Sequence, residues 1–460
     1  MSISNSSYGK DKIRELLDGG GRLHFVGISG AGMAPLAELC LFRGHAVSGS
    51  DLNQNEAYLR LSSLGARLSK IHSAEAVGDA AAVVYSLAVS EDNEEIAYAR
   101  ERGIPLISRA ELLGAISGGY SKSVGISGTH GKSTTVAMTS EIFSSGGLSP
   151  TVVSGATLPS GESLRTGAED LFIYEACEYR DSFLLTEPSV SVILNVELDH
   201  TDYFHSEAEL EESFLEFARS ARDLALVNTD GEIGRRIFER LDGKKLSFGS
   251  TKDADFRYKI LSFGGGRVDF SLYFKCRSLG EYSINTIGRH LCEDAVAAIA
   301  VSYLIGVNPN TAREALLRYS GIARRLESLG RVLGREIIYD YAHHPSELSA
   351  VISSVKENLG KCTVIFRPHT YSRTEALWDG FVAALREADF VVLTDVFAAR
   401  EREIPGVNSS ELARAIGRRA VSLSSGEVVD YVLRRTSGTI LLMGAGEVED
   451  IKRELLKRKE

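Results

Sequence analysis

The segment VGISGTHGKSTT, from Val124 to Thr135, carries the residues whose types and spacing most clearly point to chemistry. An apolar run leads into a glycine turn, and GKST follows where a helix is expected to begin. Lys132 could reach the β- and γ-phosphates of a nucleotide, Ser133 could ligate Mg²⁺, and backbone amides could surround the phosphate oxygens. The pattern GxxxxGK[ST] is incomplete, because Ile126 stands where its first glycine is expected.

The segment nevertheless predicts a binding site for a nucleoside triphosphate. The residues predicted to line it are Gly128, Thr129, His130, Gly131, Lys132, Ser133 and Thr134. For His130 alone, a packed or solvated loop histidine is the alternative to a role in the site.

Two later apolar runs end in acidic residues that could hold the metal ion of such a site. LFIY leads into Glu175, with Glu178 three residues further on, and SVSVILNV leads to LDHTDYF, which contains Asp199 and His200. Single acids at strand ends are usually solvated loop residues. Two such strands after one phosphate loop favour carboxylates that hold Mg²⁺.

An earlier glycine loop, VGISGAGM, shares its first five letters with the phosphate loop but has no lysine after them. Its glycines lie between an expected strand and helix, where backbone amides could meet a diphosphate. Asp51 ends the next expected strand, and its carboxylate could accept hydrogen bonds from a ribose. Two alternatives are a turn needed only for packing and a site for NAD. The residues predicted to form the site are Gly27, Ser29, Gly30, Gly32, Met33 and Asp51.

A third group of polar residues lies in YDYAHHPSE, from Tyr339 to Glu347, and in FRPHTYSRTEAL, from Phe366 to Leu377. Each segment follows an apolar strand, so each is expected at the carboxyl edge of a parallel sheet, where open α/β sheets bind ligands. Arginine and histidine at such an edge suit a carboxylate or a phosphate. Ordinary polar surface loops are the alternative.

Bulk properties limit the classes of function. A net charge of −10 over 460 residues argues against general binding to nucleic acid. No apolar run is long enough to span a membrane, and the first residues do not resemble a secretion signal, so we expect a cytoplasmic protein without membrane insertion. The five cysteines are scattered and form no CxxC pair, so we expect buried small side chains and neither a disulfide framework nor a zinc site.

Strands and helices alternate along the chain in a way that predicts three α/β domains in series. A chain of 460 residues is too long to fold around a single hydrophobic core. We predict a Rossmann-like domain at 1–116, a central P-loop ATPase-type domain at 117–323 and a second Rossmann-like domain at 324–460. A stretch from about Leu246 to Ile287, rich in strands and turns, is expected to be a β-rich insertion in the central domain, followed by a helix from His290 to Ile305.

Taken in order, these segments resemble the motifs of the Mur ligases. The resemblance runs from GISGAGM to LLMGAGEVEDI and rests on GTHGKSTT, EACEYRDSF, NVELDHTDYF, GRH, RRLESLG, DYAHHPSE and FRPHTYSRTEAL. It implies an enzyme of peptidoglycan precursor synthesis that uses ATP and Mg²⁺ (or Mn²⁺) to join L-alanine to the lactyl carboxylate of UDP-N-acetylmuramate. An acyl phosphate would be the intermediate, and ADP and phosphate would be released. The first domain would hold the UDP-sugar, the second ATP and the third the amino acid.

The resemblance also implies roles for individual residues. Lys132, His200, His343 and Arg373 match catalytic positions. Ser133, Glu175 and His200 match the metal ligands, and Asp294, Arg325 and Asp340 match further contacts to ATP. The residues that match the amino-acid site are Tyr341, His343, His369 and Arg373.

The chain departs from the family pattern at a few positions. Ser29 replaces a glycine of the first loop, Thr370 stands where some members have arginine, and Leu291 and Asp294 replace two asparagines of the adenine pocket. The segment from His200 to Arg219 has no lysine, which favours the alanine-adding branch over ligases that carry a carbamylated lysine there.

Other functions stay open at this stage. They are a ligase for a murein peptide or another amino acid, a nucleotide-sugar-binding paralogue with little turnover, and, from the first loop alone, a nicotinamide oxidoreductase. Either a monomer or a dimer is compatible with the sequence.

Overall fold

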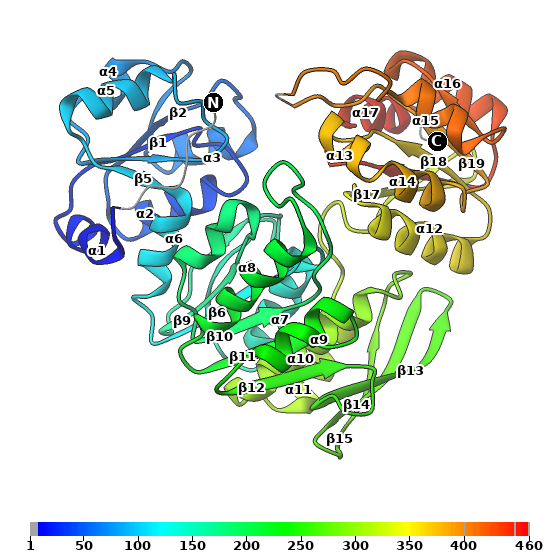
Figure 1. Cartoon of the computed structure of the whole chain (residues 1–460), viewed down its shortest axis with the longest axis horizontal. Helices are drawn as coiled ribbons and strands as arrows, with labels where there is room; N and C mark the ends of the chain where they lie inside the picture. The colour runs from blue at the N-terminus through cyan, green and yellow to red at the C-terminus, as the bar shows by residue number, and fades with distance from the viewer. Residues whose placement is uncertain (1–7, 400, 446–447, 459–460) are drawn as a thin grey trace. The chain divides into compact units, whose positions relative to one another are not determined.

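The structure is a computed structural model that describes residues 8–399, 401–445 and 448–458 (Figure 1). Gly446 and Glu447, in the LLMGAGEVEDI segment, lie outside the described residues. The chain divides into two compact units. The first unit comprises Met1–Val196, Glu211–Gly249 and Ala297–Ala312, and the second comprises Glu197–Leu210, Ser250–Val296 and Arg313–Glu460. Within the described ranges, the helices are all too short or too polar to cross a membrane.

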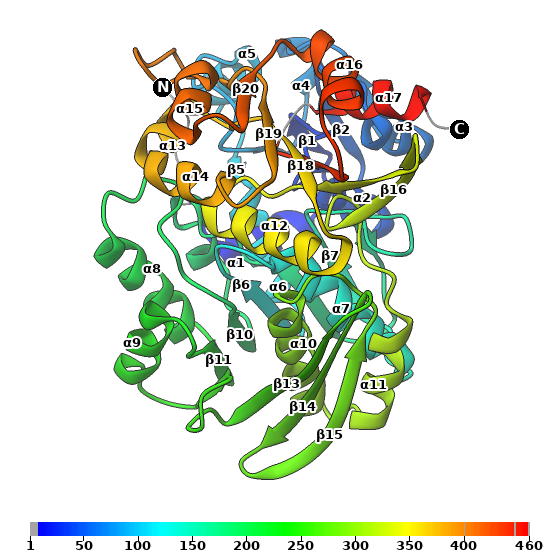
Figure 2. The same cartoon turned by 90° about the vertical axis from the view of Figure 1, so that its right-hand side faces the viewer.

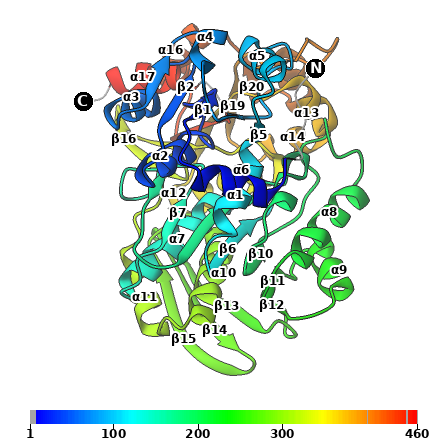
Figure 3. The ribbon, with the colours of Figure 1, turned by 90° about the vertical axis from the view of Figure 1, so that its left-hand side faces the viewer.

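The first sheet is parallel throughout and has the strand order β3-β2-β1-β4-β5. Its strands are β1 (Leu23–Val26), β2 (Val47–Ser50), β3 (Arg67–Ser69), β4 (Ala82–Tyr85) and β5 (Leu106–Ser108). The helices around it are α1 (Lys10–Asp18), α2 (Ala34–Phe42), α3 (Glu56–Ser63), α4 (Ala74–Val77), α5 (Glu94–Arg102) and α6 (Arg109–Ser117). Figure 3 shows α1 lying along α6, and the two helices are in contact.

The strand order of this sheet reverses at β1. Right-handed crossovers therefore place α2 and α3 on one face and α4 and α5 on the other, and the helices of each pair contact one another. Ligands of open parallel sheets bind where the order reverses, beyond the carboxyl ends of the strands. The first glycine loop follows β1 and so lies at this point.

The central sheet of the first unit is mostly parallel, with the order β12-β11-β10-β6-β9-β7-β8, and β8 is antiparallel to β7. Its strands are β6 (Lys122–Ser127), β7 (Thr151–Val153), β8 (Leu164–Arg165), β9 (Leu171–Glu175), β10 (Val190–Ile193), β11 (Leu224–Asn228) and β12 (Lys245–Gly249). The associated helical segments are α7 (Lys132–Ser145), η1 (Tyr179–Leu185), α8 (Glu207–Arg219), α9 (Glu232–Arg240), α10 (Leu291–Ile305) and α11 (Pro309–Arg318).

Three antiparallel strands make up the β-rich insertion, and Figure 2 shows them as a long ribbon. They are β13 (Phe256–Gly264), β14 (Arg267–Phe274) and β15 (Arg277–Ile284). The predicted start of this insertion near Leu246 was too early, because β12 pairs in parallel with β11 and continues the central sheet.

The last sheet belongs to the second unit and has the order β16-β17-β21-β18-β19-β20, in which only the β16–β17 pair is antiparallel. Its strands are β16 (Glu327–Val332), β17 (Arg335–Asp340), β18 (Cys362–Phe366), β19 (Phe390–Leu393), β20 (Ala420–Ser422) and β21 (Thr439–Met443). Its helices are α12 (Pro345–Leu359), α13 (Tyr371–Ala376), α14 (Trp378–Leu385), α15 (Ser409–Ile416), α16 (Ser425–Arg435) and α17 (Glu449–Lys457). The central strands are apolar on both faces, so the sheet has one apolar core on each side.

The cysteines follow the expectation only in part. All five are free, and Cys40, Cys292 and Cys362 are buried. Cys177 is half-buried at the exit of β9. Cys276 is exposed in the turn between β14 and β15, where its backbone φ is positive, so the expectation of burial was wrong for this residue.

Candidate functional site

The phosphate loop joins β6 to α7, and two of its glycines are required by the backbone. Gly131 has a φ of 81° and is the residue before the first turn of α7. Gly128 has a φ of 147°, and a Cβ atom there would lie 2.9 Å from the Cβ of Leu194. Both positions exclude larger residues, so the loop can pass close to β10 and turn into the helix.

Asn195, just beyond β10, fixes the position of this loop. Its carbonyl oxygen accepts from the amide of Thr129 at 3.1 Å, and its side-chain oxygen accepts from the amide of His130 at 2.8 Å. The side-chain amide donates back to the His130 carbonyl at 3.2 Å. Asn195 was not among the residues predicted from the sequence. Its position after an apolar strand, in NVELDH, was the signal that could have identified it.

Lys132 is the first residue of α7, and its ammonium group lies inside the loop. It donates to the carbonyls of Gly128 and Thr129 and forms an ion pair with Glu178, with N–O distances of 3.0 and 3.1 Å. Burial opposes the charge, but the carboxylates of Glu178 and Glu175 outweigh it, so the pKa of Lys132 lies above its usual value. The lysine is therefore charged and available to phosphate oxygens that displace Glu178.

Glu175 ends β9, and its side chain forms hydrogen bonds with groups other than Lys132. Its Oε1 accepts from the hydroxyl of Ser154 at 2.9 Å and from the amide of Gly155 at 2.6 Å, both in the segment after β7. These bonds leave its Oε2 facing Gly155, where a Cβ atom would lie 3.1 Å away. The predicted metal ligands Glu175 and Ser133 belong to the first unit and His200 to the second. Carboxylate and hydroxyl oxygens are donors that Mg²⁺ prefers, so the side chains of Glu175 and Ser133 fit the ion.

In the second unit, Arg373 on α13 forms a two-bonded ion pair with Asp199. Its Nε lies 2.9 Å from Asp199 Oδ1 and its NH2 3.2 Å from Oδ2, and both side chains are buried. Burial opposes ionisation of Asp199, but the charge of Arg373 is stronger and, with His200 and His343, holds the pKa of this carboxyl far below its usual range. Asp199 therefore fixes the guanidinium of the arginine that was predicted to be catalytic.

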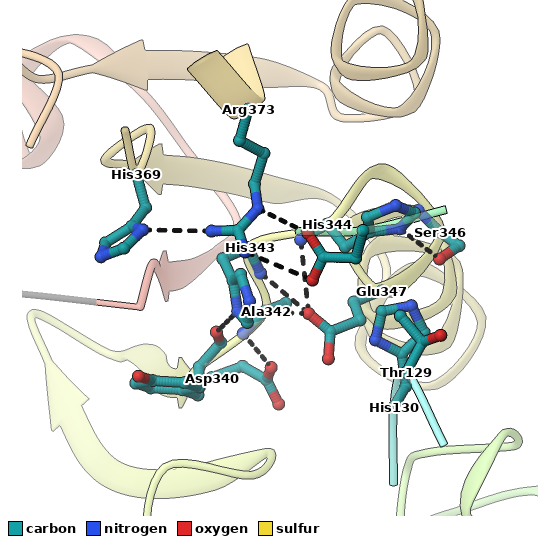
Figure 4. Close-up of polar contacts among 12 residues, drawn as sticks. Thr129, His130, Asp340, Ala342, His343, His344, Ser346, Glu347, His369 and Arg373 are labelled. Carbon is teal, nitrogen blue, oxygen red and sulfur yellow. Dashed lines mark hydrogen bonds and ion pairs between the residues drawn. The ribbon is translucent and has the colours of Figure 1, made fainter. Parts of the chain in front are cut away.

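His369 contacts the same guanidinium, as Figure 4 shows. Its Nδ1 lies 3.1 Å from NH1 of Arg373. Because arginine can only donate, Nδ1 accepts and the ring proton is on Nε2. Burial, followed by the positive charge of Arg373, lowers the pKa of His369 to about 4, so the ring is neutral near pH 7.

His343 is also a neutral imidazole. Its Nδ1 lies 3.0 Å from the carbonyl of Tyr341, which can only accept, so Nδ1 carries the proton. Its backbone amide donates to Glu347 at 3.0 Å (Figure 4). Burial lowers the pKa of His343 to about 3. The Nε2 atom of this ring is therefore the basic one.

Asp340 ends β17, and both of its oxygens accept from backbone amides. Leu326 donates to Oδ2 and Ala342 to Oδ1, each at 2.8 Å. Burial raises the pKa of Asp340 to about 6, and the nearby Arg325 opposes this effect. The guanidinium of Arg325 lies 3.4 Å from Glu347 and 5.4 Å from the ring centre of Tyr341. The predicted residues Arg325, Asp340, Tyr341, His343, His369 and Arg373 thus all lie in the second unit.

Four further positions lie in or next to helices. Leu291 and Asp294 lie in the first turn of α10 and are both buried. His344 is the residue before α12, where its side chain and Glu347 form a capping box. Thr370 precedes α13 with a positive φ of 64°.

In the first glycine loop, Asp51 holds the backbone in place. Its Oδ2 accepts from the amide of Ser29 and its Oδ1 from the amide of Asn53, each at 2.9 Å. The hydroxyl of Ser29 donates to the Asn53 carbonyl at 3.1 Å, and Gly27 has the positive φ of 75° that the turn requires. The carboxylate of Asp51, which was predicted to bind a ribose, therefore already accepts hydrogen bonds from two backbone amides.

Comparison with protein families gives three matches along the chain. The model described as "Mur ligase family, catalytic domain" matches residues 22–121. "Mur ligase middle domain" matches 126–302, and "Mur ligase, glutamate ligase domain" matches 324–446.

Curated relatives match over almost the full chain. A UDP-N-acetylmuramate--L-alanine ligase of Caldanaerobacter subterraneus subsp. tengcongensis is 35% identical over 453 residues, which cover 95% of this chain and 97% of the relative. One of the same name from Clostridium beijerinckii is 37% identical over 447 residues, with the same coverage.

Among solved structures, the UDP-N-acetylmuramate-alanine ligase MurC of Thermotoga maritima aligns with a TM-score of 0.80 and 26% identity, over 95% of this chain and 99% of that one. A murein peptide ligase of Psychrobacter arcticus aligns with a TM-score of 0.72 at 22% identity, over 95% and 98% of the two chains, which shows the fold alone. The predicted fold class is confirmed: an α/β protein with Rossmann-like first and last domains and a mixed central sheet. The chain therefore belongs to the Mur ligase family.

Proposed function

We propose that this chain is an ATP-dependent ligase that joins L-alanine to the lactyl carboxylate of UDP-N-acetylmuramate. The observation that carries the proposal is the charged Lys132 inside a phosphate loop, paired with Glu178 at the exit of the neighbouring strand β9. The curated relatives described above share one name, for this reaction, at 35% and 37% identity. We further propose that residues 1–116 hold the UDP-sugar, 117–323 hold ATP and 324–460 receive the amino acid.

In the proposed reaction, an oxygen of the lactyl carboxylate attacks the γ-phosphorus of ATP, and the bond to the leaving ADP breaks. The carboxylate has then become an acyl phosphate, which has a leaving group that a free carboxylate lacks. The amino nitrogen of L-alanine attacks the acyl carbon, phosphate departs with the former carboxylate oxygen, and an amide remains. Lys132 stabilises negative charge on the phosphate oxygens during transfer.

Within the ATP site, we propose that Gly131 to Thr134 offer the loop amides, and that Arg325 and Asp340 contact the phosphate and the ribose. Ser133, Glu175 and His200 would hold Mg²⁺ (or Mn²⁺), which supplies positive charge to the phosphate oxygens when it is bound. A related MurF ligase of Thermotoga maritima was solved in complex with ADP, which supports nucleotide use in the family.

For the amino acid, we propose that the Arg373 guanidinium, oriented by Asp199, binds the carboxylate of L-alanine. His343 is neutral near pH 7, and its Nε2 can accept a hydrogen bond from the attacking amine. Tyr341 and His369 would line the same site.

A substrate panel tests the proposal. Release of phosphate from ATP would be measured with UDP-N-acetylmuramate and L-alanine, glycine, L-serine or a murein tripeptide. We expect the highest kcat/KM for L-alanine and no release when either the UDP-sugar or the amino acid is omitted. If only the tripeptide stimulates turnover, the chain is instead a murein peptide ligase. A protein that binds UDP-N-acetylmuramate but releases no phosphate with any acceptor would contradict the ligase assignment.

A further inference from the structure

A buried polar network lies in the first domain, between the strands of its sheet and α5. Its centre is Glu95, in the first turn of α5, whose side chain is completely buried. The amide of Glu95 donates to the side chain of Asn93 at 2.9 Å, which fixes the start of the helix. A carboxylate in such surroundings is costly to ionise unless its oxygens accept hydrogen bonds.

Three side chains contact the Glu95 carboxylate, and each comes from a different strand or strand end. Nε2 of His24, on β1, lies 3.1 Å from Oε1. The hydroxyl of Ser50, the last residue of β2, donates to Oε2 at 2.6 Å, and Nδ1 of His72, in the segment after β3, lies 2.8 Å from the same oxygen. Burial opposes ionisation of Glu95, but the contacts with these three side chains outweigh it and lower the pKa of the carboxyl below its usual value. Glu95 is therefore ionised near pH 7.

The contacts define where the protons of this network are. Because the carboxylate of Glu95 can only accept, Nε2 of His24 and Nδ1 of His72 both carry protons. Nδ1 of His72 also lies 2.8 Å from the hydroxyl oxygen of Ser50, which accepts because its own proton is donated to the carboxylate. On the other side of His24, the hydroxyl of Ser48 lies 2.9 Å from Nδ1 and can donate to it. Donors and acceptors are thus matched across these five side chains, which favours a single arrangement.

Ser50 connects this network to the first glycine loop. Its backbone carbonyl accepts from the amide of Gly27 at 2.9 Å and from that of Ile28 at 3.1 Å. The next residue, Asp51, accepts from the loop amide of Ser29 at 2.9 Å. The residue whose carbonyl fixes the start of the loop is therefore held by its side chain in the buried network.

Close packing around Ser50 leaves little room for a shift of its backbone. At the neighbouring Gly49, a Cβ atom would lie 2.5 Å from the carbonyl oxygen of Phe25 and 2.7 Å from Cδ1 of Ile28. β1 and the start of the loop thus pack directly on the backbone of β2. A displacement of Ser50 would therefore move Gly27 and Ile28 as well, because no gap is present to absorb it.

We propose that Glu95 is a positioning residue for the UDP-sugar site, because its carboxylate fixes Ser50 and His72 and, through them, the end of β2, the segment after β3 and the first glycine loop. The inference rests on the proposed function, in which residues 1–116 hold the UDP-sugar, and extends it to a side chain that is completely buried. Ligands of open parallel sheets bind beyond the carboxyl ends of the strands, so the geometry of these ends determines how well the ligand fits. Loss of the carboxylate should therefore weaken binding of the UDP-sugar and leave binding of ATP unchanged.

Steady-state kinetics of the whole enzyme test this assignment. Glu95→Gln keeps the size of the side chain but replaces one accepting oxygen by a donating amide, so at least one of the three contacts is lost. We expect the KM for UDP-N-acetylmuramate to rise about five- to tenfold, the size of one hydrogen bond, while kcat and the KM for ATP stay within about twofold. Titration calorimetry with UDP-N-acetylmuramate should show the same loss of affinity. Equal increases in the KM for both substrates would overturn the proposal, because they would indicate a general loss of structure.

Glu111→Gln is the matched control. Glu111 is also a buried carboxylate in the first turn of a helix of this domain, and its Oε2 accepts from the amide and the hydroxyl of Ser108 at 3.0 and 3.2 Å. Ser108 ends β5, which is separated from β1 by β4. This variant should lose stability but keep the KM for UDP-N-acetylmuramate. If it raises this KM as much as Glu95→Gln does, the effect comes from general destabilisation of the domain and the assignment is wrong.

A second variant tests the route through Ser50. Ser50→Ala removes the hydroxyl but keeps the backbone carbonyl that the loop uses, so it should raise the KM for UDP-N-acetylmuramate selectively, and by less than Glu95→Gln does. In the double variant the increase should be smaller than the product of the two single increases, because both changes act on the same contact. Increases that multiply fully would overturn the assignment.

The outcome stays decisive if Glu95→Gln does not fold. Ser50→Ala then decides alone, and an unchanged KM for UDP-N-acetylmuramate in that variant would overturn the assignment. A wild-type enzyme that turns over normally, together with an unchanged KM in Glu95→Gln, contradicts this inference alone. A wild-type enzyme that binds no UDP-sugar contradicts the proposed function too.

Discussion

At the scale of single residues, Lys132 of the phosphate loop forms an ion pair with Glu178 when no ATP is bound. A carboxylate oxygen of Glu178 lies 3.0 Å from Nζ of Lys132, in the place that we propose for an oxygen of the γ-phosphate. The pair keeps a buried charge neutralised in the free enzyme, and binding of ATP exchanges one anion for another. Glu178 was noted in the sequence only as a neighbour of Glu175, and the spacing EACE could not indicate which of the two contacts the lysine.

Removing the ammonium should therefore abolish turnover without preventing folding. We expect Lys132→Ala to lower kcat by at least about hundredfold, the usual cost of losing a preorganised charge at a transferring phosphoryl group. The measurement is ATP-dependent phosphate release at saturating substrates. Lys122→Ala, at the exposed start of β6, is the control and should keep normal kcat. Full activity in Lys132→Ala would show that the loop does not contact the reacting phosphate.

The buried pair of Asp199 and Arg373 makes a second prediction. Asp199→Asn leaves a buried guanidinium without its counter-charge, so the free energy of unfolding should fall by about 3–5 kcal/mol. Adding Arg373→Gln should recover much of this loss, because no uncompensated charge remains. Urea denaturation of the two single variants and the double variant would measure the coupling. Strictly additive losses would mean that the two groups do not interact in solution.

Asp340 provides a prediction about pH. Its pKa is raised to about 6 by burial, against about 3.9 in an unfolded chain. Between these values the folded protein binds more protons than the unfolded one, so the free energy of unfolding should decrease as the pH rises from about 4 to 6. From the size of the shift, the decrease is on the order of 2 kcal/mol.

Denaturation curves of the wild type and of Asp340→Asn, recorded at pH 4.5 and pH 7, would measure this effect. The difference in the free energy of unfolding between the two proteins should change with pH. Asp269→Asn is the control. Hydrogen bonds from Ser262 and Ser283 lower the pKa of Asp269 to about 2, so it is ionised in the folded state throughout this window, and its variant should show a nearly constant difference. A pH-independent difference for Asp340→Asn would contradict burial of a neutral carboxyl.

At the scale of secondary structure, the sequence indicated the long apolar strands well and the short edge strands poorly. The runs LHFV, LFIY and TILLM are buried along their length, and continuous runs of this kind are the strands that a sequence indicates most clearly. β3 and β20, at sheet edges, have three residues each and half-exposed patterns, so nothing in RLS or AVS distinguishes them from loops. β12 was assigned to the insertion because the sequence does not show that it pairs with β11.

A close contact of α6 makes a prediction at this scale. A Cβ atom at Gly114 would lie 2.0 Å from the carbonyl oxygen of Leu185, at the end of η1, so the helix can pack there only with glycine. We expect Gly114→Ala to lower the free energy of unfolding by about 1–3 kcal/mol or more. Gly426→Ala, in α16 with nothing within 4 Å, is the control and should be neutral or stabilising, by up to about 1 kcal/mol. Equal stability of the two variants would show that α6 does not pack closely on η1.

At the scale of the whole molecule, each compact unit holds its own group of candidate site residues. Motif order in the sequence was enough to predict three α/β domains and the residue types of the site. Groups that position other groups were not predictable: Asn195 fixes the phosphate loop, Asp199 fixes Arg373, and Glu95 fixes Ser50. Each contact joins segments far apart in the chain, so no local spacing reveals it.

The chemistry proposed for this protein is activation of the lactyl carboxylate by phosphoryl transfer from ATP. The most direct measurement uses UDP-N-acetylmuramate with ¹⁸O in both carboxylate oxygens, together with ATP and L-alanine, and follows the label by mass spectrometry. We expect ADP as the nucleotide product, one ¹⁸O atom in each released phosphate and the other in the amide carbonyl. Release of unlabelled phosphate, or of AMP and pyrophosphate, would contradict an acyl phosphate and with it the account of this site.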